Sequence, residues 1–433
     1  MTQPLGEYSH GHAPRLTNRW VVLALLVMIA LLNYADRFLM SGLAQPIQQT
    51  FQISDATMGL LMGPAFALLY TICTVPAARL ADTGSRVRII AGGCAMWSGF
   101  TVLSGMATTP WMLALARVGV GIGEAAFQAP AAALVAAYFS VEQRGKALAL
   151  MGTAIYFGQM AGFAGGPAIA EHFGWRAAFH AIGFAGLVVA LATMLIVTEP
   201  KGHVIKEQDT SQSEAEPFLV AIRRIAAARS LWLITVLMGL GTLSGMTFAM
   251  WGPSLFARSF ALTAKDAGSA IAFSFGLPAL LGMLLFGALA DRLARRDPAA
   301  GLRLAAASLA VATTLILGIV WSKNLAAAQM LAVPSGLLGG GWSVGVYAAL
   351  QYMLPDRLRA TGTGIVLLIT GILGSVIGPV VAGQLSDWVS TADPGAHGLQ
   401  IGLSVALPLA YLGAWAGWRA MRLLEADKAS LHA

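Results

Sequence analysis

The stretch GALADRLARR, at residues 287–296, places Asp291 and three arginines directly after an apolar run. A related stretch, ARLADTGSR, occupies residues 78–86 and also follows an apolar run. The two aspartates, Asp82 and Asp291, are 209 positions apart in a chain of 433 residues. The chain therefore repeats this motif at a distance of about half its length.

Two further pairs of motifs repeat in the same order at nearly the same spacing. Arg144 in EQRGKALAL corresponds to Arg359 in DRLRATGTG, 215 positions later. The Gly166-Pro167 step corresponds to the Gly-Pro step at residues 378–379, 212 positions later. Three unrelated motifs that share one period predict two halves of parallel topology. In membrane proteins such halves form alternating-access transporters, in which they rock about a central site.

The composition is typical of a polytopic membrane protein. Hydrophobic residues make up 57% of the chain, whereas Asp, Glu, Lys and Arg together make up 11%, against about a quarter in an ordinary soluble domain. A soluble protein of this length would leave much of that apolar surface exposed to water. The composition therefore excludes a cytosolic enzyme, a disordered protein and a disulfide scaffold. At about 20 residues for each spanning helix, the chain is long enough for about a dozen spans.

Twelve apolar segments mark the predicted spans. They lie near residues 20–43, 57–80, 88–107, 111–138, 145–168, 175–197, 231–256, 267–290, 302–321, 325–352, 361–384 and 399–420. The first is too long for the core of a signal peptide, so we expect a retained span. The short alternating strands of a membrane β-barrel are absent from the sequence. We predict an all-α polytopic membrane protein with twelve transmembrane helices in two six-helix pseudo-symmetric bundles.

Lysine and arginine predict the topology. Of 27 such residues, 21 fall on one side of the predicted membrane, and four, Arg176, Arg258, Lys265 and Lys323, fall on the other. The positive-inside rule places the richer side, with both termini, in the cytoplasm. We expect an integral protein of a bacterial inner (plasma) membrane. The predicted parts are a cytoplasmic N-terminal tail (1–19), an N-terminal six-helix bundle (20–198), a cytoplasmic linker (199–230), a C-terminal six-helix bundle (231–422) and a cytoplasmic tail (423–433).

Four charged residues lie well inside predicted spans rather than at their ends. Asp36 and Arg37 belong to the first span, and Arg117 and Glu124 belong to the fourth. Such charges cost several kcal/mol at bilayer depth unless they are paired or hydrated, so function is the first hypothesis and a structural ion-pair network the second. The seven-residue spacing of the fourth-span pair puts both on one helix face, roughly 10 Å apart. A carboxylate there can load and release a proton, and a nearby arginine opposes this until substrate competes for it.

The second half has no comparable charge within its spans. Its candidate cavity residues are polar, aromatic or Met side chains, namely Thr247, Met250, Trp251, Trp342, Ser343, Tyr347 and Gln351, beside Met246 and Phe248. Tyr34 of the first span joins this candidate cavity. Met and aromatic side chains at such positions also serve as packing alone. One charged wall and one apolar, aromatic wall suit an amphipathic substrate better than a plain sugar.

The repeated motifs supply candidate gating residues. These are Asp82, Arg86, Arg144, Asp291, Arg292, Arg295 and Arg359. An aspartate at a helix end can pair with an arginine or face a helix N-terminus and so hold one conformation closed, although such charges also serve topology alone.

Small residues and proline recur in the fifth and eleventh spans. The helix-packing candidates are Gly162, Gly166, Pro167, Gly378 and Pro379. Glycine lets helices approach closely, and proline bends them. A tight, bent pair at the interface of the halves would limit proton leakage; plain packing without substrate contact is the alternative.

The sequence has no HExxH, GxSxG or P-loop motif and no His/Cys cluster. We therefore expect no enzymatic activity, no catalytic residue, no metal and no cofactor. Cys73 and Cys94 are read as small buried hydrophobes, and His180 as an interfacial histidine or a proton relay. The expected partners are a small-molecule substrate, protons and the bilayer, without nucleic acid. A non-transporting receptor or a membrane-embedded enzyme is the hypothesis from another class.

The chain resembles the major facilitator superfamily. The resemblance rests on ALADRLARR at 288–296, ARVGVGIG at 116–123, GFAGGP at 162–167 and the twofold repeat. Within the superfamily, NYADRFLMSG at 33–42 and RVGVGIGEAAFQAPAAALVAAYF at 117–139 resemble the spinster-like lipid transporters. The Asn-Tyr-x-Asp-Arg part alone is also similar to organic anion:proton symporters of the sugar-acid type.

The spinster-like resemblance implies the major facilitator fold, a monomer, and proton-linked movement of lysophospholipids or sphingoid phosphates by alternating access. It implies that Asp36 and Glu124 are the protonation sites. It also implies that Arg37 and Arg117 tune them or bind an anionic headgroup. The alternative on the same scaffold is a proton-coupled transporter of a small organic anion, such as a sugar acid, or of a drug.

Overall fold

The computed structural model describes residues 17–200, 218–294, 297, 299–393 and 397–432. These residues form helices and short connections, without a β-strand among them. Eleven helices in this described part are long and apolar enough to span a membrane. The prediction of an all-α polytopic membrane protein is thus confirmed. Most of the predicted N-terminal tail and much of the predicted linker lie outside the described residues.

The helices fall into an N-terminal and a C-terminal half. The N-terminal half contains α1 (Arg19–Gly42), α2 (Ala44–Phe51), α3 (Asp55–Met62), α4 (Pro64–Thr83), α5 (Arg86–Gly105), α6 (Pro110–Glu124), α7 (Gln128–Tyr138), α8 (Val141–Met160), α9 (Gly166–Phe173) and α10 (Trp175–Ile196). The C-terminal half contains α11 (Phe218–Ala227), α12 (Arg229–Ser259), α13 (Ala264–Ile271), α14 (Leu277–Ala294), α15 (Ala300–Val320), α16 (Leu325–Met353), α17 (Asp356–Gly371), α18 (Gly378–Ala392), α19 (Gly398–Ala406) and α20 (Leu409–His432). Three π-helical turns, Ala161–Gly165, Ala272–Gly276 and Ile372–Ile377, connect α8 to α9, α13 to α14 and α17 to α18.

The one predicted span without a counterpart among these eleven helices is the tenth, 325–352, which corresponds to α16. This helix has 29 residues and packs along α14 and α15, but it is not among the eleven apolar candidates. Its glycines, with Gln329 and Gln351, dilute the apolar residues and lower its mean hydropathy. The same glycines let it lie very close to α14, because a Cβ on Gly340 would be 1.9 Å from the Ala279 carbonyl oxygen. In α16, close backbone packing therefore takes the place of large apolar side chains in holding the helix against α14.

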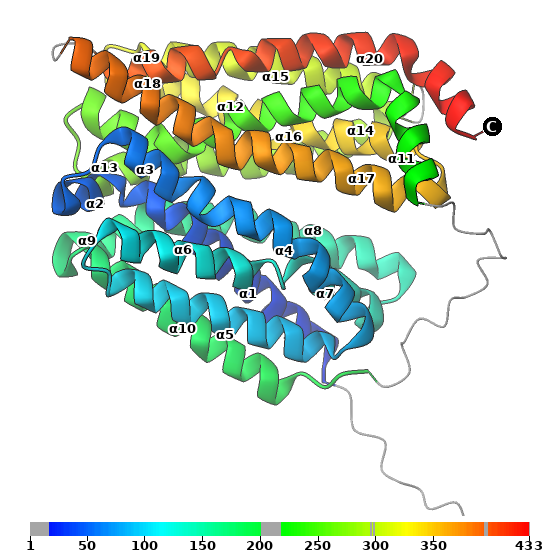
Figure 1. Ribbon diagram of the computed structural model, residues 1–433, viewed down its shortest axis with the longest axis horizontal. Coiled ribbons are helices and arrows are strands. Elements are labelled where there is room, and N and C mark those ends of the chain that lie inside the picture. Colours follow the sequence, from blue (N-terminus) through cyan, green and yellow to red (C-terminus); the bar gives the residue numbers. More distant parts are fainter. Residues whose placement is uncertain (1–16, 201–217, 295–296, 298, 394–396, 433) are drawn as a thin grey trace, which may run out of the picture.

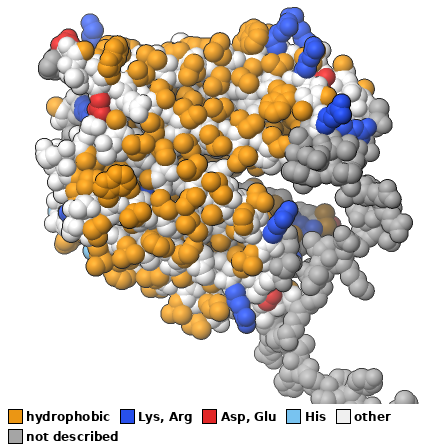
Figure 2. All heavy atoms as spheres, in the orientation of Figure 1, with side chains coloured by type: hydrophobic (Ala, Val, Ile, Leu, Met, Phe, Trp, Pro, Cys, Tyr) orange, Lys and Arg blue, Asp and Glu red, His pale blue; other side chains and the backbone are white. Residues whose placement is uncertain are grey.

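The two halves lie side by side along their length (Figure 1). The described chain ends, the C-terminal end of α10 and helix α11 lie at one end of the molecule, on the right of Figure 1, which we call the proximal end. The short helix α2 and the start of α13 lie at the opposite end of the molecule, which we call the distal end. In Figure 2 the surface is hollowed between the halves toward the proximal end.

The outer surface is apolar around both halves. Figure 2 shows hydrophobic side chains over the middle of the molecule, with most of the visible arginine and lysine at its proximal edge. Large side chains such as Trp111 and Leu195 are 79% and 75% exposed. Water would make such exposure costly, whereas lipid tails solvate it. The surface is therefore that of a protein embedded in a bilayer.

Proline interrupts each of the four spans that provide much of the contact between the halves. Pro64 begins α4 after a break at Gly63, and Pro167, Pro278 and Pro379 each come two residues after a π-helical turn. Proline cannot donate a hydrogen bond to the carbonyl four residues earlier, and a widened turn accommodates the missing bond. The spans predicted to bend at Pro167 and Pro379 therefore change helix type just before these prolines.

Backbone atoms of these interrupted spans contact the opposite half directly. The Phe163 carbonyl, four residues before Pro167, lies so close to Gly268 that a Cβ there would be 1.9 Å from the oxygen. The Ser375 carbonyl, four residues before Pro379, lies against Gly63, where a Cβ would be 2.9 Å away. Both contacts need glycine, because any side chain would overlap a carbonyl group of the other half.

We predict that Gly268→Leu prevents the distal ends of the halves from closing fully, because its side chain would overlap the Phe163 carbonyl. The measurement is the distance between spin labels on Gln49→Cys and Ala392→Cys in a background without Cys73 and Cys94, and we expect it to lengthen. Gly165→Leu is the matched control, because its Cβ meets nothing within 4 Å. An unchanged distance in Gly268→Leu would contradict the contact.

Candidate functional site

The four charged residues predicted within the spans meet inside the N-terminal half. Asp36 and Arg37 follow each other on α1, so their side chains leave the helix about 100° apart and reach different partners. Arg117 and Glu124 lie on one face of α6, about two turns apart. This placement gives two separate ion pairs between the two helices, one for each residue of α1.

The first pair joins Arg117 to Asp36. Their Nη1 and Oδ2 atoms are 2.7 Å apart, and the side chains are 2% and 0% exposed. The Thr101 hydroxyl on α5 lies 3.0 Å from the other oxygen of Asp36, and it also lies 3.0 Å from the Trp97 carbonyl oxygen. Both oxygens of Asp36 therefore have a hydrogen-bond donor.

The second pair joins Arg37 to Glu124. Their Nη2 and Oε2 atoms are 2.7 Å apart, and the Glu124 side chain has no exposed surface. The Arg37 guanidinium lies 5.0, 4.7 and 4.8 Å from the ring centres of Tyr34, Phe66 and Tyr70. Aromatic faces attract a cation, most strongly where water is excluded. Arg37 is thus held by one carboxylate and three rings.

Glu124 differs from Asp36 in its second oxygen. Among the described residues no hydrogen-bond donor reaches Glu124 Oε1, although that atom is buried. The Nε atoms of Arg37 and Arg117 are likewise buried without an acceptor in the described part. Buried polar atoms without partners cost free energy and often mark functional sites. The cluster is balanced in charge but incomplete in hydrogen bonds, so a proton or a polar ligand can add to it without displacing an existing contact.

An apolar cavity of about 180 Å³ lies beside this cluster, toward the C-terminal half. Phe38, the neighbour of Arg37 on α1, lines it. Its other lining residues come mostly from α12, α15 and α16 and include Ser244, Phe275, Leu309, Ile316 and Trp342. The Tyr156 hydroxyl on α8 donates to the Gly340 carbonyl at 3.0 Å, which ties the halves together at this depth.

The structure distributes the predicted cavity residues among several environments. Trp342 lines the apolar cavity, and Tyr34 lies in the charged cluster, where its hydroxyl accepts from Gln128. Trp251 is fully buried and donates to the Pro379 carbonyl at 3.0 Å. Tyr347 and Gln351 are exposed further along α16, toward its proximal end. Trp342 and Tyr34 therefore adjoin the cavity or the cluster, as does Met246, which also lines the cavity.

The described candidate gating residues lie at the proximal end. Arg295 and the side chains of Asp82 and Asp291 fall outside the described part. Arg144 Nε donates to the Phe139 carbonyl at 3.1 Å, and the Arg359 guanidinium donates to the Leu354 carbonyl at 3.4 Å. These two residues of the repeat thus occupy equivalent positions, each bonding a carbonyl five residues earlier. Arg292 is exposed on α14, and the Arg86 backbone N–H lies 3.3 Å from a Glu199 carboxylate oxygen. Their gating role stays a prediction.

The predicted packing glycines lie where helices approach closely. A Cβ on Gly162 would be 2.7 Å from the Ala35 carbonyl oxygen of α1, and one on Gly166 would be 2.1 Å from Leu39. In the second half, a Cβ on Gly378 would be 2.2 Å from the Thr247 hydroxyl of α12. Both spans therefore pack tightly against the first span of their own half.

Sequence reasoning missed a polar network at the distal end. The Arg258 guanidinium at the end of α12 binds both carboxylate oxygens of Asp55 at the start of α3, at 2.6 and 2.7 Å. The Ser386 hydroxyl on α18 donates to Asp55 at 2.6 Å, and the Gln48 amide on α2 donates to it at 2.7 Å. The only available signal was Arg258 itself, one of the four basic residues on the side poor in positive charge.

A second carboxylate crosses the interface in the opposite direction. Asp387 on α18 accepts the backbone N–H groups of Asp55 and Ala56, at 3.0 and 2.8 Å, and so caps the N-terminus of α3. Lys265 and Glu171 pair across the halves at 2.8 Å, but both are partly exposed. Together with the pair between Arg258 and Asp55, these contacts hold the distal ends of the two halves together.

Two six-helix halves that enclose buried charges and an apolar cavity define a polytopic membrane transporter. The Major Facilitator Superfamily model matches residues 26–379, and the chain belongs to this superfamily. It is a transporter of the spinster-like type and not an enzyme, as the following comparisons show.

Three similar proteins illustrate the relationship. An MFS-type efflux pump of Mycolicibacterium smegmatis is 30% identical over 394 residues, which cover 91% of this chain and 90% of that protein. Protein spinster of Drosophila melanogaster is 30% identical over 336 residues, which cover 73% of this chain and 55% of the fly protein. A bacterial homologue of the human lysosomal transporter spinster, solved in an inward-facing and unoccupied conformation, superposes with a TM-score of 0.83 at 26% identity, over 96% of this chain and 99% of that one.

We predict that Arg117→Met lowers the free energy of unfolding by about 3–5 kcal/mol, because it leaves Asp36 buried without a cation. Adding Asp36→Leu to Arg117→Met should restore most of this loss, since no isolated charge remains. Unfolding by SDS titration measures both effects. Arg292→Met, at an exposed position, is the control and should change stability by about 0.5 kcal/mol or less. Equal losses in the single and double variants would contradict the pairing.

Proposed function

We propose that this spinster-like transporter moves an amphipathic lipid, a lysophospholipid or a sphingoid phosphate, across the membrane by proton-coupled alternating access. The observation that carries the proposal is that a charged site and an apolar site adjoin each other. Arg37 belongs to the buried charged cluster, and its neighbour Phe38 lines the apolar cavity of about 180 Å³. A molecule with an anionic head and an apolar tail matches this arrangement along one helix.

Glu124 is the first candidate for the exchangeable proton. Its Oε1 has no donor among the described residues, so a proton can bind there without breaking a hydrogen bond. Protonation removes the charge that holds Arg37, and the released guanidinium then attracts an anion. Asp36 is the second candidate, but both its oxygens already have donors, so its proton must compete with Thr101 or Arg117.

The arginines are the proposed partners of the headgroup. Arg37 has 14% of its side chain exposed, whereas Arg117 has 2%. A substrate therefore meets Arg37 first, with Arg117 behind it keeping Asp36 neutralised. Phosphate and carboxylate groups bind a guanidinium in bidentate geometry, and the low dielectric strengthens such a contact.

The predicted topology gives this cycle a direction in space. With the proximal end in the cytoplasm, the closed distal end faces the outside of a plasma membrane, and the hollow between the halves faces inward. The proposed transporter acts as a monomer, and its gating residues at the proximal end close the opposite side when the halves rock.

A second candidate function is proton-coupled transport of a small organic anion, such as a sugar acid, or of a drug. The similarity to an MFS-type efflux pump over nine-tenths of the chain favours the drug form of this alternative, and the Asn-Tyr-x-Asp-Arg stretch favours the sugar-acid form. A sugar acid would use the charged cluster but would not need the apolar cavity, because it has no apolar tail.

We predict that Glu124→Gln abolishes accumulation driven by a pH gradient but retains substrate exchange, since glutamine cannot carry the proton. Asp36→Asn should have the same effect or stop transport. The assay follows labelled lysophosphatidylcholine, a sphingoid phosphate and a hexuronate in liposomes containing purified protein. Normal gradient-driven accumulation in both variants would exclude these carboxylates as the proton sites.

The apolar cavity separates lipid transport from sugar-acid transport. We predict that Gly245→Leu, which fills the cavity without a clash because its Cβ meets nothing within 4 Å, lowers lysolipid transport about tenfold or more. This corresponds to losing the burial of one or two methylene groups of the tail. Hexuronate transport, if present, should not change. Gly99→Leu is the control, since its Cβ also meets open space and it does not line the cavity. Equal effects on both substrates would contradict a tail site.

A further inference from the structure

The distal end of the C-terminal half already binds an anion, the carboxylate of Asp55. The C-terminal half contributes three donors to it, two from the Arg258 guanidinium and one from the Ser386 hydroxyl, at 2.6 to 2.7 Å. A bidentate guanidinium with an added hydroxyl is a typical receptor for carboxylate and phosphate groups. The N-terminal half supplies only the anion and the Gln48 amide.

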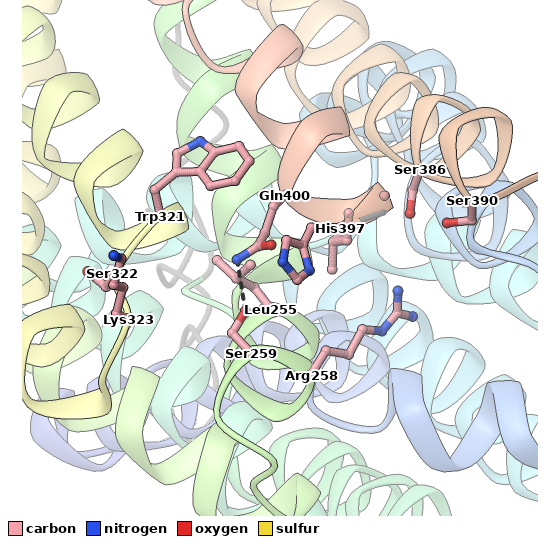
Figure 3. A pocket seen from close by; sticks show the side chains of 12 residues that line it. Leu255, Arg258, Ser259, Trp321, Ser322, Lys323, Ser386, Ser390, His397 and Gln400 are labelled. Carbon is pink, nitrogen blue, oxygen red and sulfur yellow. Dashed lines mark hydrogen bonds between the residues drawn. The ribbon is translucent and has the colours of Figure 1, made fainter. Parts of the chain in front are cut away.

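This receptor opens into a cavity of about 550 Å³ within the C-terminal half (Figure 3). We call it the distal vestibule. Its lining residues are Leu255, Arg258, Ser259, Trp321, Ser322, Lys323, Ser386, Ser390, His397, Gly398, Leu399 and Gln400. In Figure 3, Arg258 lies on one side of the cavity and Lys323 on the other, with His397 and Gln400 between them.

The distal vestibule is positively charged. Its described lining includes Arg258 and Lys323 but no carboxylate. The nearest acidic side chain on α18, Asp387, is turned to the backbone of α3 and is not part of the lining. Even with Asp387 counted, the two permanent cations leave a net charge of +1 once Asp55 is removed. His397 and the serine hydroxyls add further donors.

Rocking of the halves removes Asp55 from this receptor. Asp55 belongs to α3 of the N-terminal half, whereas Arg258 and Ser386 belong to the C-terminal half. When the distal ends part, Arg258 loses its counter-ion and Ser386 loses its acceptor, while both stay beside the cavity. An anion from solution can then take the place of the Asp55 carboxylate.

We propose that the distal vestibule is a binding site for a phosphate or carboxylate group, and that Asp55 occupies it whenever the distal end is closed. A ligand that binds only one conformation stabilises that conformation. The anion therefore favours the form open at the distal end, and Asp55 competes with it. This site is separate from the charged cluster between α1 and α6, so the proposal does not depend on the substrate carried there.

Two variants that break the same ion pair test the proposal. Asp55→Asn removes the competing anion but keeps the receptor, whereas Arg258→Gln removes the receptor. Equilibrium dialysis of the full-length protein against radiolabelled inorganic phosphate, at constant ionic strength set with potassium chloride, measures binding. We expect Asp55→Asn to bind phosphate about two- to fivefold more tightly than the unaltered chain, the range expected for loss of a partly exposed ion pair. Arg258→Gln should show no phosphate binding at the same concentrations.

Two further variants locate the anion. Lys323→Gln removes a cation of the distal vestibule that does not touch Asp55 and should weaken phosphate binding several-fold in the Asp55→Asn background. Lys265→Gln removes a distal cation that pairs with Glu171 instead, and should leave phosphate binding unchanged. Spin labels on Gln49→Cys and Ala392→Cys report the consequence, because phosphate should lengthen their distance in the unaltered chain and not in Arg258→Gln.

The source of the anion is decided by a second probe. Dialysis is repeated with lysophosphatidic acid as competitor, which carries the phosphate on a lipid. Displacement by inorganic phosphate alone supports a site for free anions, and stronger displacement by lysophosphatidic acid supports a site for a lipid headgroup. Equal phosphate affinity in Asp55→Asn and Arg258→Gln, or binding of neither probe to Asp55→Asn, would overturn the proposal.

Discussion

The requirement that buried charges be neutralised organises the centre of this transporter. Asp36 and Glu124 have no exposed surface, and each is balanced by an arginine at 2.7 Å. Because both pairs link α1 to α6, these helices cannot shift relative to each other without separating charges in a medium of low dielectric. The N-terminal half is therefore a rigid frame around a charged cluster, and changes of charge by a proton or a ligand are the natural way to alter it.

The same principle acts at the distal end with a different outcome. There the opposite charges lie on different halves, so separating the halves exposes the charges to water rather than to lipid. Arg258 is already 35% exposed on its side chain, and its separation from Asp55 costs far less than separation of the buried pairs. Ion pairs within one half therefore stay closed unless a proton or a ligand changes their charge, whereas ion pairs between the halves separate when the halves part. The degree of burial therefore decides whether an ion pair stays closed or separates when the halves part.

The sequence predicted the helical architecture and the charged cluster well, because a charge in an apolar span is visible without a structure. It did not predict which arginine pairs with which carboxylate, since that depends on the rotation of α1 against α6. Asp55 does not stand out in the sequence. It follows Ser54, which caps α3, so its place at a helix start is enough to account for an acidic residue there. Its partner Arg258 is 203 positions away. The prolines predicted bends, but the contacts between Phe163 and Gly268 and between Ser375 and Gly63 arise only when two halves pack together.

Those glycine contacts make the interface unusual in how it tolerates change. A carbonyl oxygen of one half touches the Cα of a glycine on the other, so no side chain contributes to the contact. Substitution of Phe163 or Ser375 leaves the carbonyl in place, whereas any substitution of Gly268 or Gly63 adds atoms where there is no room. Gly59 against the Pro379 carbonyl and Gly383 against the Asp55 carbonyl make contacts of the same kind. The cavity walls can thus diverge toward new substrates while these backbone contacts between the halves stay constant, because only substitution of the contacting glycines adds atoms to them.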